Sequence, residues 1–276
     1  MPLKLFYITN RPDIAFIAQD AGVDRIFVDM EYIDKALRQG GMDTVQSHHT
    51  IEDIRKLRTV VNRAELLVRC NPVHERTKNY CSTEEEVDNI VSAGADIIML
   101  PFFKTKMEVE RFLHAVKGRC RTMLLFETPD SVKNADEILA LKGIDEAYIG
   151  LNDLSIGYKR KFMFELLSDG TVENLCLKFR LKKLTYGFGG IAAIGTGELP
   201  AEAILREHYR LGSSMVILAR SFCNYQKIGN IELVREKLVS GIRTFRAFES
   251  EIECHTQYFK RNRDFVADCI RRLKNT

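Results

Sequence analysis

The chain of 276 residues contains no tryptophan, only six prolines and no long uninterrupted hydrophobic run. A membrane-spanning helix needs about 20 predominantly apolar residues, so we expect no association with a membrane. A strong excess of one charge is also absent, because 41 basic and 38 acidic side chains leave a net charge of +3. Without a dense basic stripe, the sequence gives little support to nucleic-acid binding.

Seven cysteines are present, but they are scattered and none forms a CxxC pair. A disulfide scaffold or a zinc knuckle would need closer pairing. The first residues, MPLKLFYITNRPD, also lack the long apolar segment of a secretory signal peptide. We therefore expect reduced cysteines and a cytoplasmic protein.

What the sequence does contain is a recurring junction in which a glycine precedes a short apolar run. The junctions are Gly22 before 26–28, Gly94 before 97–100, Gly143 before 147–149 and Gly212 before 215–218. Glycine often ends a helix, because it adopts a left-handed backbone conformation at little cost. The apolar runs are typical of strands that are buried on both faces. Each junction therefore predicts the passage from a helix to a buried strand.

Eight apolar segments alternate with segments of helical periodicity, two of which begin with the capping patterns at Thr50 and Ser82. Strands are predicted at 3–8, 25–30, 65–69, 96–101, 121–126, 145–150, 185–191 and 215–219. Eight β/α units in about 220 residues predict an α/β fold, the (β/α)8 TIM barrel. A doubly wound open sheet is the alternative, although no glycine-rich dinucleotide loop follows the first strand.

The helical patterns continue beyond the eighth strand. Helices are predicted at 105–117 and 129–140 within the barrel and at 231–250 and 254–273 after it. No linker rich in proline, glycine or serine divides the chain, so we expect one barrel domain over residues 1–276 with C-terminal helices over 231–276. The last helix exceeds what a barrel needs. We expect it to pack on a neighbouring subunit of a homo-oligomer.

Charged residues directly follow several of the apolar runs. TIM-barrel sites form where strands end, and a packed core does not explain charges at these positions. The residues are Asp29, Glu31, Arg69, Glu127, Asp153 and Arg220. Any one of them could be a structural ion pair or a helix cap, but together they predict a polar site on one rim of the barrel.

Glu127 and Asp153 are the most informative pair, because they lie one β/α unit apart and therefore on adjacent strands. Two carboxylates without a neighbouring histidine or cysteine suit Mg²⁺ or Mn²⁺ better than zinc. Arg69 could face a carboxylate or a developing enolate oxygen with its planar fork of donors. The alternative for Asp153 is the N-cap of the next helix.

Four stretches resemble the HpcH/HpaI aldolase and citrate lyase beta family in their order and spacing, over about residues 3–225. They are IFVDME at 26–31, LVR at 67–69, LLFET at 124–128 and GLNDLS at 150–155. The resemblance implies a phosphoenolpyruvate/pyruvate-type barrel that uses a divalent metal and often exchanges its terminal helices between subunits. By matching position, Glu127 and Asp153 would be the metal ligands, and Arg69 would face the pyruvyl oxygen.

The same resemblance extends to the neighbours of these residues. Asp29 and Glu31 would orient metal-bound water and the arginine, and Leu151 and Asn152 are expected to bind substrate. The predicted activity is that of a divalent-metal-dependent aldehyde-lyase, of the class II pyruvate aldolase type, that acts on a 2-oxo acid through an enolate. The alternatives are a citryl- or malyl-type CoA-thioester lyase of the same family and a catalytically reduced metal-binding barrel.

Two positions depart from the aldolase branch of that family. The branch has a histidine after the second-strand glutamate and a glutamine two residues before the metal-binding glutamate, where this chain has Tyr32 and Leu125. A tyrosine with an ordinary pKa near 10 is a poor general base at pH 7. The loop from Gln39 to His49 could supply an imidazole through His48 or His49, which are otherwise polar residues ahead of the Thr50 cap.

The main glycine cluster, residues 187–200, leaves the seventh predicted strand. Barrels often bind phosphate near strands seven and eight through backbone N–H groups. The cluster could therefore hold a phosphorylated or nucleotide-linked substrate, or form a tight loop that closes over the metal. It matches neither a Walker loop nor the GxGxxG pattern.

Overall fold

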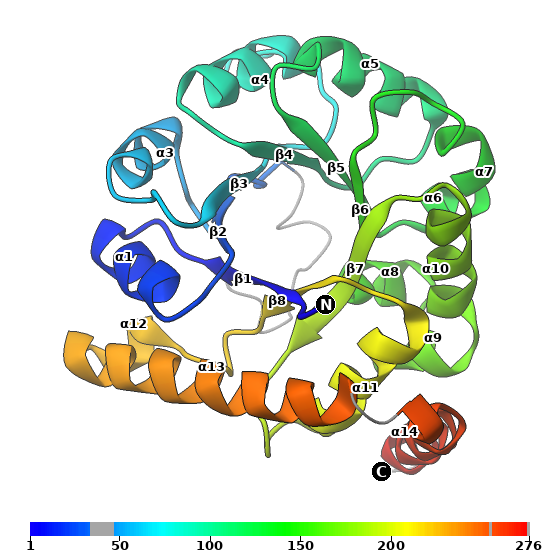
Figure 1. The fold of residues 1–276 in the computed structure, drawn as a ribbon. Helices are drawn as coiled ribbons and strands as arrows, with labels where there is room; N and C mark the ends of the chain where they lie inside the picture. The colour runs from blue at the N-terminus through cyan, green and yellow to red at the C-terminus, as the bar shows by residue number, and fades with distance from the viewer. Residues whose placement is uncertain (34–46, 254–255, 275–276) are drawn as a thin grey trace.

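Eight parallel strands form a closed barrel in the computed structural model, which describes residues 1–33, 47–253 and 256–274 (Figure 1). The strands are β1 (Lys4–Ile8), β2 (Arg25–Asp29), β3 (Glu65–Arg69), β4 (Ile97–Leu100), β5 (Arg121–Phe126), β6 (Glu146–Ile149), β7 (Thr185–Ile191) and β8 (Met215–Leu218). Each strand pairs with the next in sequence, and β8 pairs with β1 to close the ring. The TIM-barrel prediction is confirmed, and the open sheet is excluded.

Helices surround the barrel, as Figure 1 shows. They are α1 (Pro12–Asp20), α3 (Ile51–Arg58), α4 (Thr83–Ser92), α5 (Lys106–Val116), α6 (Pro129–Lys133), α7 (Ala135–Ile138), α8 (Leu151–Gly157), α9 (Glu165–Ser168), α10 (Thr171–Leu181), α11 (Ala201–Leu211), α12 (Tyr225–Ile228), α13 (Ile231–Glu253), the 3-10 turn η1 (Thr256–Tyr258) and α14 (Phe259–Lys274). The single helix predicted over 129–140 is two helices, because the backbone leaves the helical conformation at Asn134 (φ −92°, ψ 11°).

Local signals in the sequence account for several helix boundaries. Thr50 and Ser82 each form a capping box with the residue three positions later, which satisfies backbone N–H groups at the start of α3 and α4. Gly94 and Gly212 have φ values of +100° and +73° just before β4 and β8. These conformations confirm the predicted helix-to-strand junctions.

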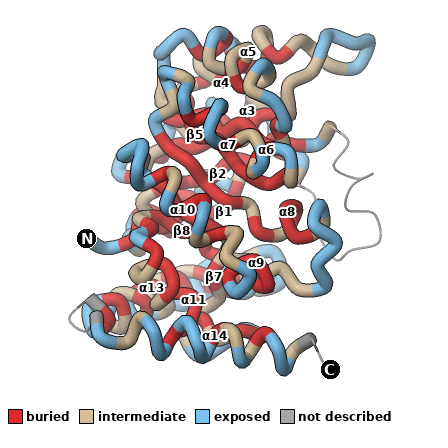
Figure 2. Tube along the Cα trace, turned by 90° about the vertical axis from the view of Figure 1, so that its right-hand side faces the viewer, coloured by how far each residue is buried: buried red, intermediate tan, exposed pale blue. Residues whose placement is uncertain are grey.

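The side chains inside the barrel form layers along its axis, because alternate residues of a strand point to the same face. In β2 and β3 the inward positions are Arg25, Phe27 and Asp29, and Glu65, Leu67 and Arg69. The middle layer belongs to a separate apolar cluster that also contains Phe6, Met99, Met123, Tyr148 and Met215. Figure 2 shows these buried central segments within a more exposed ring of helices. The barrel interior is therefore charged at its amino end, apolar in the middle and polar at its carboxyl end.

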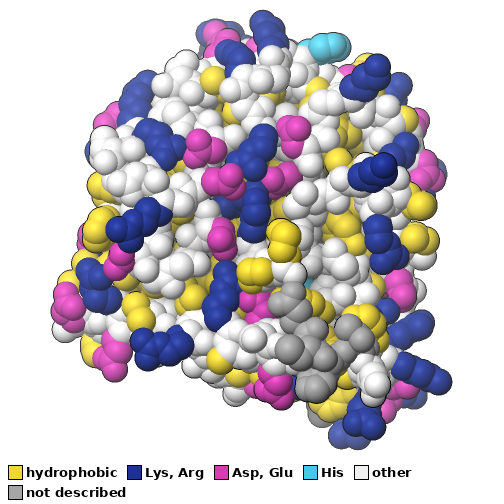
Figure 3. Space-filling view, viewed as in Figure 1, with side chains coloured by type: hydrophobic (Ala, Val, Ile, Leu, Met, Phe, Trp, Pro, Cys, Tyr) yellow, Lys and Arg dark blue, Asp and Glu magenta, His cyan; other side chains and the backbone are white. Residues whose placement is uncertain are grey.

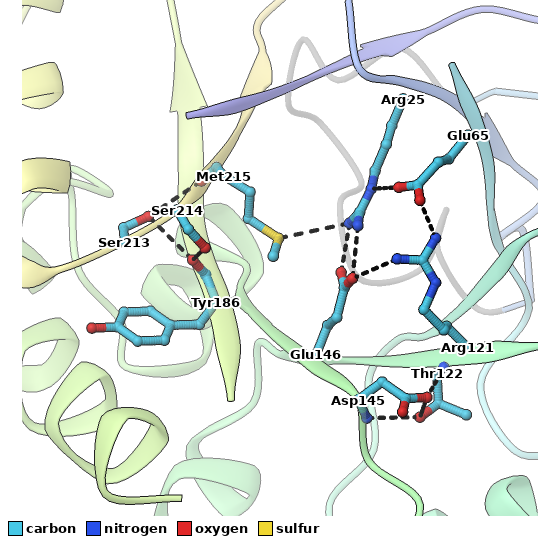
Figure 4. Close-up of polar contacts among 10 residues, drawn as sticks. All are labelled: Arg25, Glu65, Arg121, Thr122, Asp145, Glu146, Tyr186, Ser213, Ser214 and Met215. Atoms are coloured by element: carbon cyan, nitrogen blue, oxygen red, sulfur yellow. Dashed lines mark hydrogen bonds and ion pairs between the residues drawn. The ribbon is translucent and has the colours of Figure 1, made fainter. Parts of the chain in front are cut away.

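The amino-end layer is a compact ion cluster (Figure 4). Arg25 is fully buried and donates from Nη1 and Nη2 to both oxygens of Glu146, at 2.5 and 2.7 Å, and from Nε to Glu65 at 2.8 Å. Arg121 pairs with both of these carboxylates. The cluster balances two positive against two negative charges, which offsets the cost of burying Arg25.

The two long C-terminal helices lie on the same side of the barrel as α11 in both Figure 1 and Figure 2. In this chain α14 packs on α9 and α11. Asn262 in α14 donates to the carbonyl of Ala203 at 3.0 Å and to Glu207 at 2.8 Å. Exchange of this helix between subunits, and the homo-oligomer, stay predictions.

The described residues include no helix that is long and apolar enough to cross a membrane. Figure 3 shows Lys and Arg side chains interspersed with Asp and Glu over the visible face, which agrees with the small net charge. No large field of one sign covers this face.

Candidate functional site

A pocket of about 590 Å³ opens at the carboxyl end of the barrel. Seven of the predicted site residues line it, namely Asp29, Arg69, Glu127, Leu151, Asn152, Asp153 and Arg220. Its floor is the apolar middle layer of the barrel, including Phe27, Met99 and Leu125. Strand ends thus bring together residues that are far apart in the sequence, as parallel barrels do.

Arg69 is held in place by two acidic residues from β2 and the segment after it. Its Nε and Nη2 donate to the two oxygens of Asp29, at 2.9 and 2.8 Å, and its Nη1 lies 3.2 Å from Oε2 of Glu31. These acids raise the pKa of Arg69 well above its usual value although burial opposes this, so the charge persists. The two hydrogen bonds to Asp29 use two of the five guanidinium N–H groups. The other N–H groups remain for the ion pair with Glu31 and for a ligand.

Glu31 itself is not part of the pocket lining, although it is fully buried. Its backbone N–H donates to Asp29 at 3.2 Å. Glu31 therefore reaches the pocket through its ion pair with Arg69, and the orienting role stays a prediction.

Glu127 is buried at the end of β5 and held from two sides. The backbone N–H of Phe102 donates to its Oε1 at 3.0 Å, and Phe102 has a left-handed backbone (φ +51°). On the other side, a Cβ added at Gly150 would lie 2.7 Å from Oε2 and 2.8 Å from Cβ of Glu127. The carboxylate therefore occupies space that only a glycine leaves open at the end of β6.

Asp153 is buried in the first turn of α8, which directly follows β6. The N-cap of α8 is Gly150, so the alternative that Asp153 is the N-cap is wrong. Asp153 instead lines the pocket that also contains Glu127.

The donor set in this pocket fits a hard divalent cation. Glu127 and Asp153 supply carboxylate oxygens to one pocket, and Gly150 leaves the space that Glu127 occupies there. No group of three or more His, Cys, Asp or Glu side chains suited to a metal exists among the described residues. Mg²⁺ usually binds to one or two carboxylates and keeps other positions for water and substrate. Two protein ligands are enough for such an open site.

His48 and His49 both line the pocket, whereas Tyr32 does not. The backbone N–H of Asp29 donates to Nδ1 of His49 at 3.0 Å, so the neutral ring carries its proton on Nε2. Tyr32 is 41% exposed, and its ring lies 5.5 Å from that of Tyr80. Burial and Glu86 raise the pKa of Tyr32 further above its usual value. The earlier part of the predicted loop, including Gln39, lies outside the described residues.

The glycine cluster at 187–200 only partly reaches the site. Gly189 and Gly190 line the pocket, but Gly195 and Gly197 line a different hollow beside Arg206. The backbone N–H of Gly195 donates to Glu202 at 2.8 Å. The outer part of the cluster therefore lies away from the acidic residues that would bind a metal.

Sequence reasoning missed several lining residues, including Tyr7, Asn10 and Asn224 on the β1 and β8 side and Tyr148 in β6. Tyr148 lies inside the barrel, where its hydroxyl donates to the carbonyl of Gly189 at 2.6 Å and accepts from the N–H of Ile217 at 2.9 Å. It joins β6, β7 and β8 where the β7–β8 register shifts. The signal for Tyr148 is a polar hydroxyl at an inward position of a buried strand.

Comparisons with known proteins agree with this architecture. The model of the HpcH/HpaI aldolase/citrate lyase family matches residues 3–169, more than half of the chain. Similar solved structures include an HpcH/HpaI aldolase from Desulfitobacterium hafniense DCB-2 (18% identity, TM-score 0.61, 85% of this chain and 93% of that chain). An HpcH/HpaI aldolase/citrate lyase family protein from Burkholderia cenocepacia J2315 has 14% identity and a TM-score of 0.61, over 85% and 95% of the two chains.

A third similar structure is that of the citrate synthase SbnG, with 14% identity and a TM-score of 0.59 over 86% of this chain and 94% of that chain. At these identities the structures show a shared fold. No curated protein matches the sequence.

Proposed function

Because this chain belongs to the HpcH/HpaI aldolase/citrate lyase family, we propose that it is a divalent-metal-dependent carbon–carbon lyase that acts on a 2-oxo acid through a pyruvate-type enolate. One observation carries the proposal. Glu127, Asp153 and an acid-clamped Arg69 line a single pocket at the carboxyl end of the barrel. Such a pocket combines oxygen ligands for a cation with a fixed positive charge for an anionic substrate.

Glu127 and Asp153 would hold the cation, and Mg²⁺ or Mn²⁺ suits their oxygen donors best. When bound, the cation would supply positive charge where negative charge develops on the pyruvyl unit. Leu151 and Asn152 directly precede Asp153 in the first turn of α8 and would contact the substrate.

Arg69 would bind the anionic 2-oxo acid through N–H groups that do not donate to Asp29. Its orientation is fixed before substrate arrives, because Asp29 holds it with two parallel hydrogen bonds and Glu31 with an ion pair. Donors that are already oriented need little reorganisation when charge develops. Asp29 and Glu31 are therefore positioning residues for Arg69.

His49 would carry the proton transfer that Tyr32 cannot. Its ring is buried at the pocket wall, and the N–H of Asp29 fixes its tautomer. Histidine is the side chain whose usual pKa lies near neutral pH. Tyr7 and Tyr148 also line the pocket, but burial raises both pKa values above the usual tyrosine range, and each hydroxyl donates to a backbone carbonyl.

The decisive experiment measures exchange of the methyl protons of pyruvate with solvent deuterium in the presence of Mg²⁺ or Mn²⁺. The wild-type protein should catalyse exchange. Glu127→Ala and Asp153→Ala should each reduce exchange by at least about 100-fold, since removal of one well-placed electrostatic group costs that much. Both variants should also lose Mn²⁺ binding in calorimetric titrations.

The control is Glu232→Ala, which removes an exposed carboxylate of α13 outside the pocket and should change neither measurement. Absence of exchange with every divalent ion, in a folded wild-type protein that binds Mn²⁺, would contradict the lyase proposal. That result would favour the metal-binding barrel instead.

A further inference from the structure

Asn71 lies outside the pocket lining and connects two segments that are far apart in the sequence. It is the second residue after β3 and is almost fully buried. Its side-chain Oδ1 accepts from the backbone N–H groups of Tyr32 and Ile33, each at 3.0 Å. These two N–H groups directly follow Glu31, which forms an ion pair with Arg69. One side chain therefore fixes the backbone next to a residue that holds the arginine of the pocket.

The other end of the Asn71 amide is held by Glu86, a buried carboxylate of α4. Nδ2 of Asn71 donates to Oε1 of Glu86 at 2.7 Å, and the backbone N–H of Asn71 donates to both carboxylate oxygens at 3.2 Å. Burial raises the pKa of Glu86, but the hydrogen bonds from Asn71 and the charge of His74 favour its ionised form. Within the described part of the chain, the Glu86 carboxylate accepts hydrogen bonds from Asn71 alone.

The donors and acceptors around Asn71 allow only one orientation of its amide. An ionised carboxylate can only accept a hydrogen bond, and a backbone N–H can only donate. With the amide reversed, its NH2 group would face the N–H groups of Tyr32 and Ile33, and its oxygen would face Glu86. Both ends would then leave buried polar groups without partners, which is unfavourable. Glu86 therefore determines that an oxygen of Asn71 faces the segment after β2.

Glu31 is fixed from both directions along the chain. Before it, the backbone N–H of Met30 donates to the carbonyl of Arg69 at 3.0 Å, and the N–H of Glu31 itself donates to Asp29 at 3.2 Å. After it, the next two N–H groups donate to Asn71. The Glu31 carboxylate lies 3.2 Å from Nη1 of Arg69, so the position of this backbone sets the geometry of the ion pair.

We propose that Glu86 and Asn71 are positioning residues for the binding of the substrate anion. They fix the backbone after β2, and this backbone holds Glu31 against Arg69. Neither Glu86 nor Asn71 lines the pocket, so both act through other residues. The inference rests on the proposed function, because that function supplies the anion at Arg69.

The proposed metal ligands lie outside this chain of contacts. Glu127 follows β5 and Asp153 lies in α8, whereas the contacts of Asn71 join α4 to the ends of β2 and β3. Disruption of the contacts should therefore weaken anion binding and leave metal binding unchanged. A general loss of structure would weaken both.

A reciprocal exchange of side chains tests the contacts. Asn71→Asp places a second carboxylate against Glu86. The double variant Asn71→Asp with Glu86→Gln pairs a new carboxylate with a new amide, so that an oxygen again faces the N–H groups of Tyr32 and Ile33. We expect the double variant to recover most of what Asn71→Asp loses, because residues in contact are coupled in a double-mutant cycle.

The first measurement is hydrogen exchange at the N–H groups of Tyr32 and Ile33, followed by NMR. Asn71→Asp should raise both exchange rates about 10-fold, which corresponds to the loss of one hydrogen bond. The double variant should restore the slow rates. This measurement needs no ligand, so it tests the contacts independently of the pyruvate exchange assay.

The second measurement is calorimetric titration with Mn²⁺, and of the Mn²⁺-loaded protein with pyruvate. Asn71→Asp should weaken pyruvate binding about 10-fold, the lower end of the range for groups that support a ligand-binding residue, with unchanged Mn²⁺ affinity. The double variant should recover pyruvate affinity. The matched control is Asp88→Asn, which removes an exposed carboxylate of the same helix, where it pairs with Arg119, and should change neither measurement.

Three results would overturn the proposal. They are rapid exchange of both N–H groups in the wild type, a double variant that recovers nothing, and equal losses of pyruvate and Mn²⁺ affinity in Asn71→Asp. A wild-type protein that binds Mn²⁺ but no pyruvate would reject the proposed function. Slow amide exchange that Asn71→Asp abolishes and the double variant restores would still support the positioning of the backbone beside Glu31.

Discussion

Gly150 matters because of the side chain that it lacks. Its φ of −83° suits any residue, so the backbone does not require glycine. The requirement comes from Glu127, whose carboxylate and Cβ would both lie within 3 Å of an added methyl group. The absence of a side chain at Gly150 therefore allows Glu127, a proposed metal ligand, to adopt its observed position.

We expect Gly150→Ala to displace Glu127 and to weaken Mn²⁺ binding at least about 10-fold, since changes of the groups that support a ligand typically cost 10- to 100-fold in metal affinity. Calorimetric titration with Mn²⁺ measures the effect. Gly190→Ala is the control, because its added Cβ would meet only Ile217 O, at 3.6 Å, and Ala219 Cβ, at 3.7 Å. Equal losses of affinity in both variants would contradict the steric explanation.

At the residue scale, the sequence could predict which side chains meet at the rim but not how they are held. Asp29, Arg69 and Glu127 were predictable, because each follows an apolar strand. The hydrogen bond from the Phe102 N–H to Glu127 accompanies a left-handed backbone at Phe102. Non-glycine residues rarely adopt this conformation, and no local sequence pattern predicts it here.

At the scale of elements, the ion cluster at the amino end joins four strands. Arg25, Glu65, Arg121 and Glu146 are each the first residue of their strand, and Arg25 stands opposite Glu65 in the β2–β3 register. Charges at four strand starts are visible in the sequence, but their meeting requires the barrel to close. The free-energy cost of burying Arg25 is offset only if its acidic partners have suitable geometry, and the sequence does not show that geometry.

We expect Glu146→Leu to lower the free energy of unfolding by about 3 kcal/mol, because it leaves the buried Arg25 with only Glu65 as a direct partner. Urea denaturation with an unchanged m-value measures the loss. Glu232→Ala removes one partner of an exposed pair on α13 and should change stability by less than about 1 kcal/mol. A loss below about 1 kcal/mol in Glu146→Leu would mean that the cluster is not desolvated.

The predicted strands differ from the observed ones by at most one residue at each end, because short apolar runs between glycine junctions and polar residues mark them clearly. The helices were less predictable. Helical periodicity runs through 129–140, yet the chain breaks at Asn134, whose side chain donates to the carbonyl of Lys104 at 2.9 Å. Helical periodicity cannot predict this contact, because it depends on a segment that is distant in the sequence.

At the scale of the whole molecule, His208 links stability to pH. Its ring is fully buried in α11, stacks on Phe188 at 3.9 Å, and shares a 2.8 Å hydrogen bond between Nδ1 and Oγ of Ser213. Burial lowers its pKa to about 3. Between pH 6.5 and about 3, the unfolded chain therefore binds a proton that the folded chain does not, and the free energy of unfolding falls as the pH falls.

We expect His208→Asn to remove this contribution while keeping a polar group near Ser213. The free energy of unfolding of the variant should fall less steeply with decreasing pH, by up to about 1.4 kcal/mol per pH unit between pH 5.5 and 4. Denaturation at several pH values compares the slopes, so a general loss of stability in the variant does not affect the comparison. Parallel slopes for the two proteins would show that His208 is protonated in the folded state.

The closed amino end of the barrel limits how small molecules can enter and leave the pocket. The ion cluster around Arg25 and the apolar layer above it fill the barrel below the pocket, so the pocket has no passage in that direction. Reactants and products of the proposed cleavage must then share one entrance. Neither product of that cleavage can therefore leave through the amino end of the barrel.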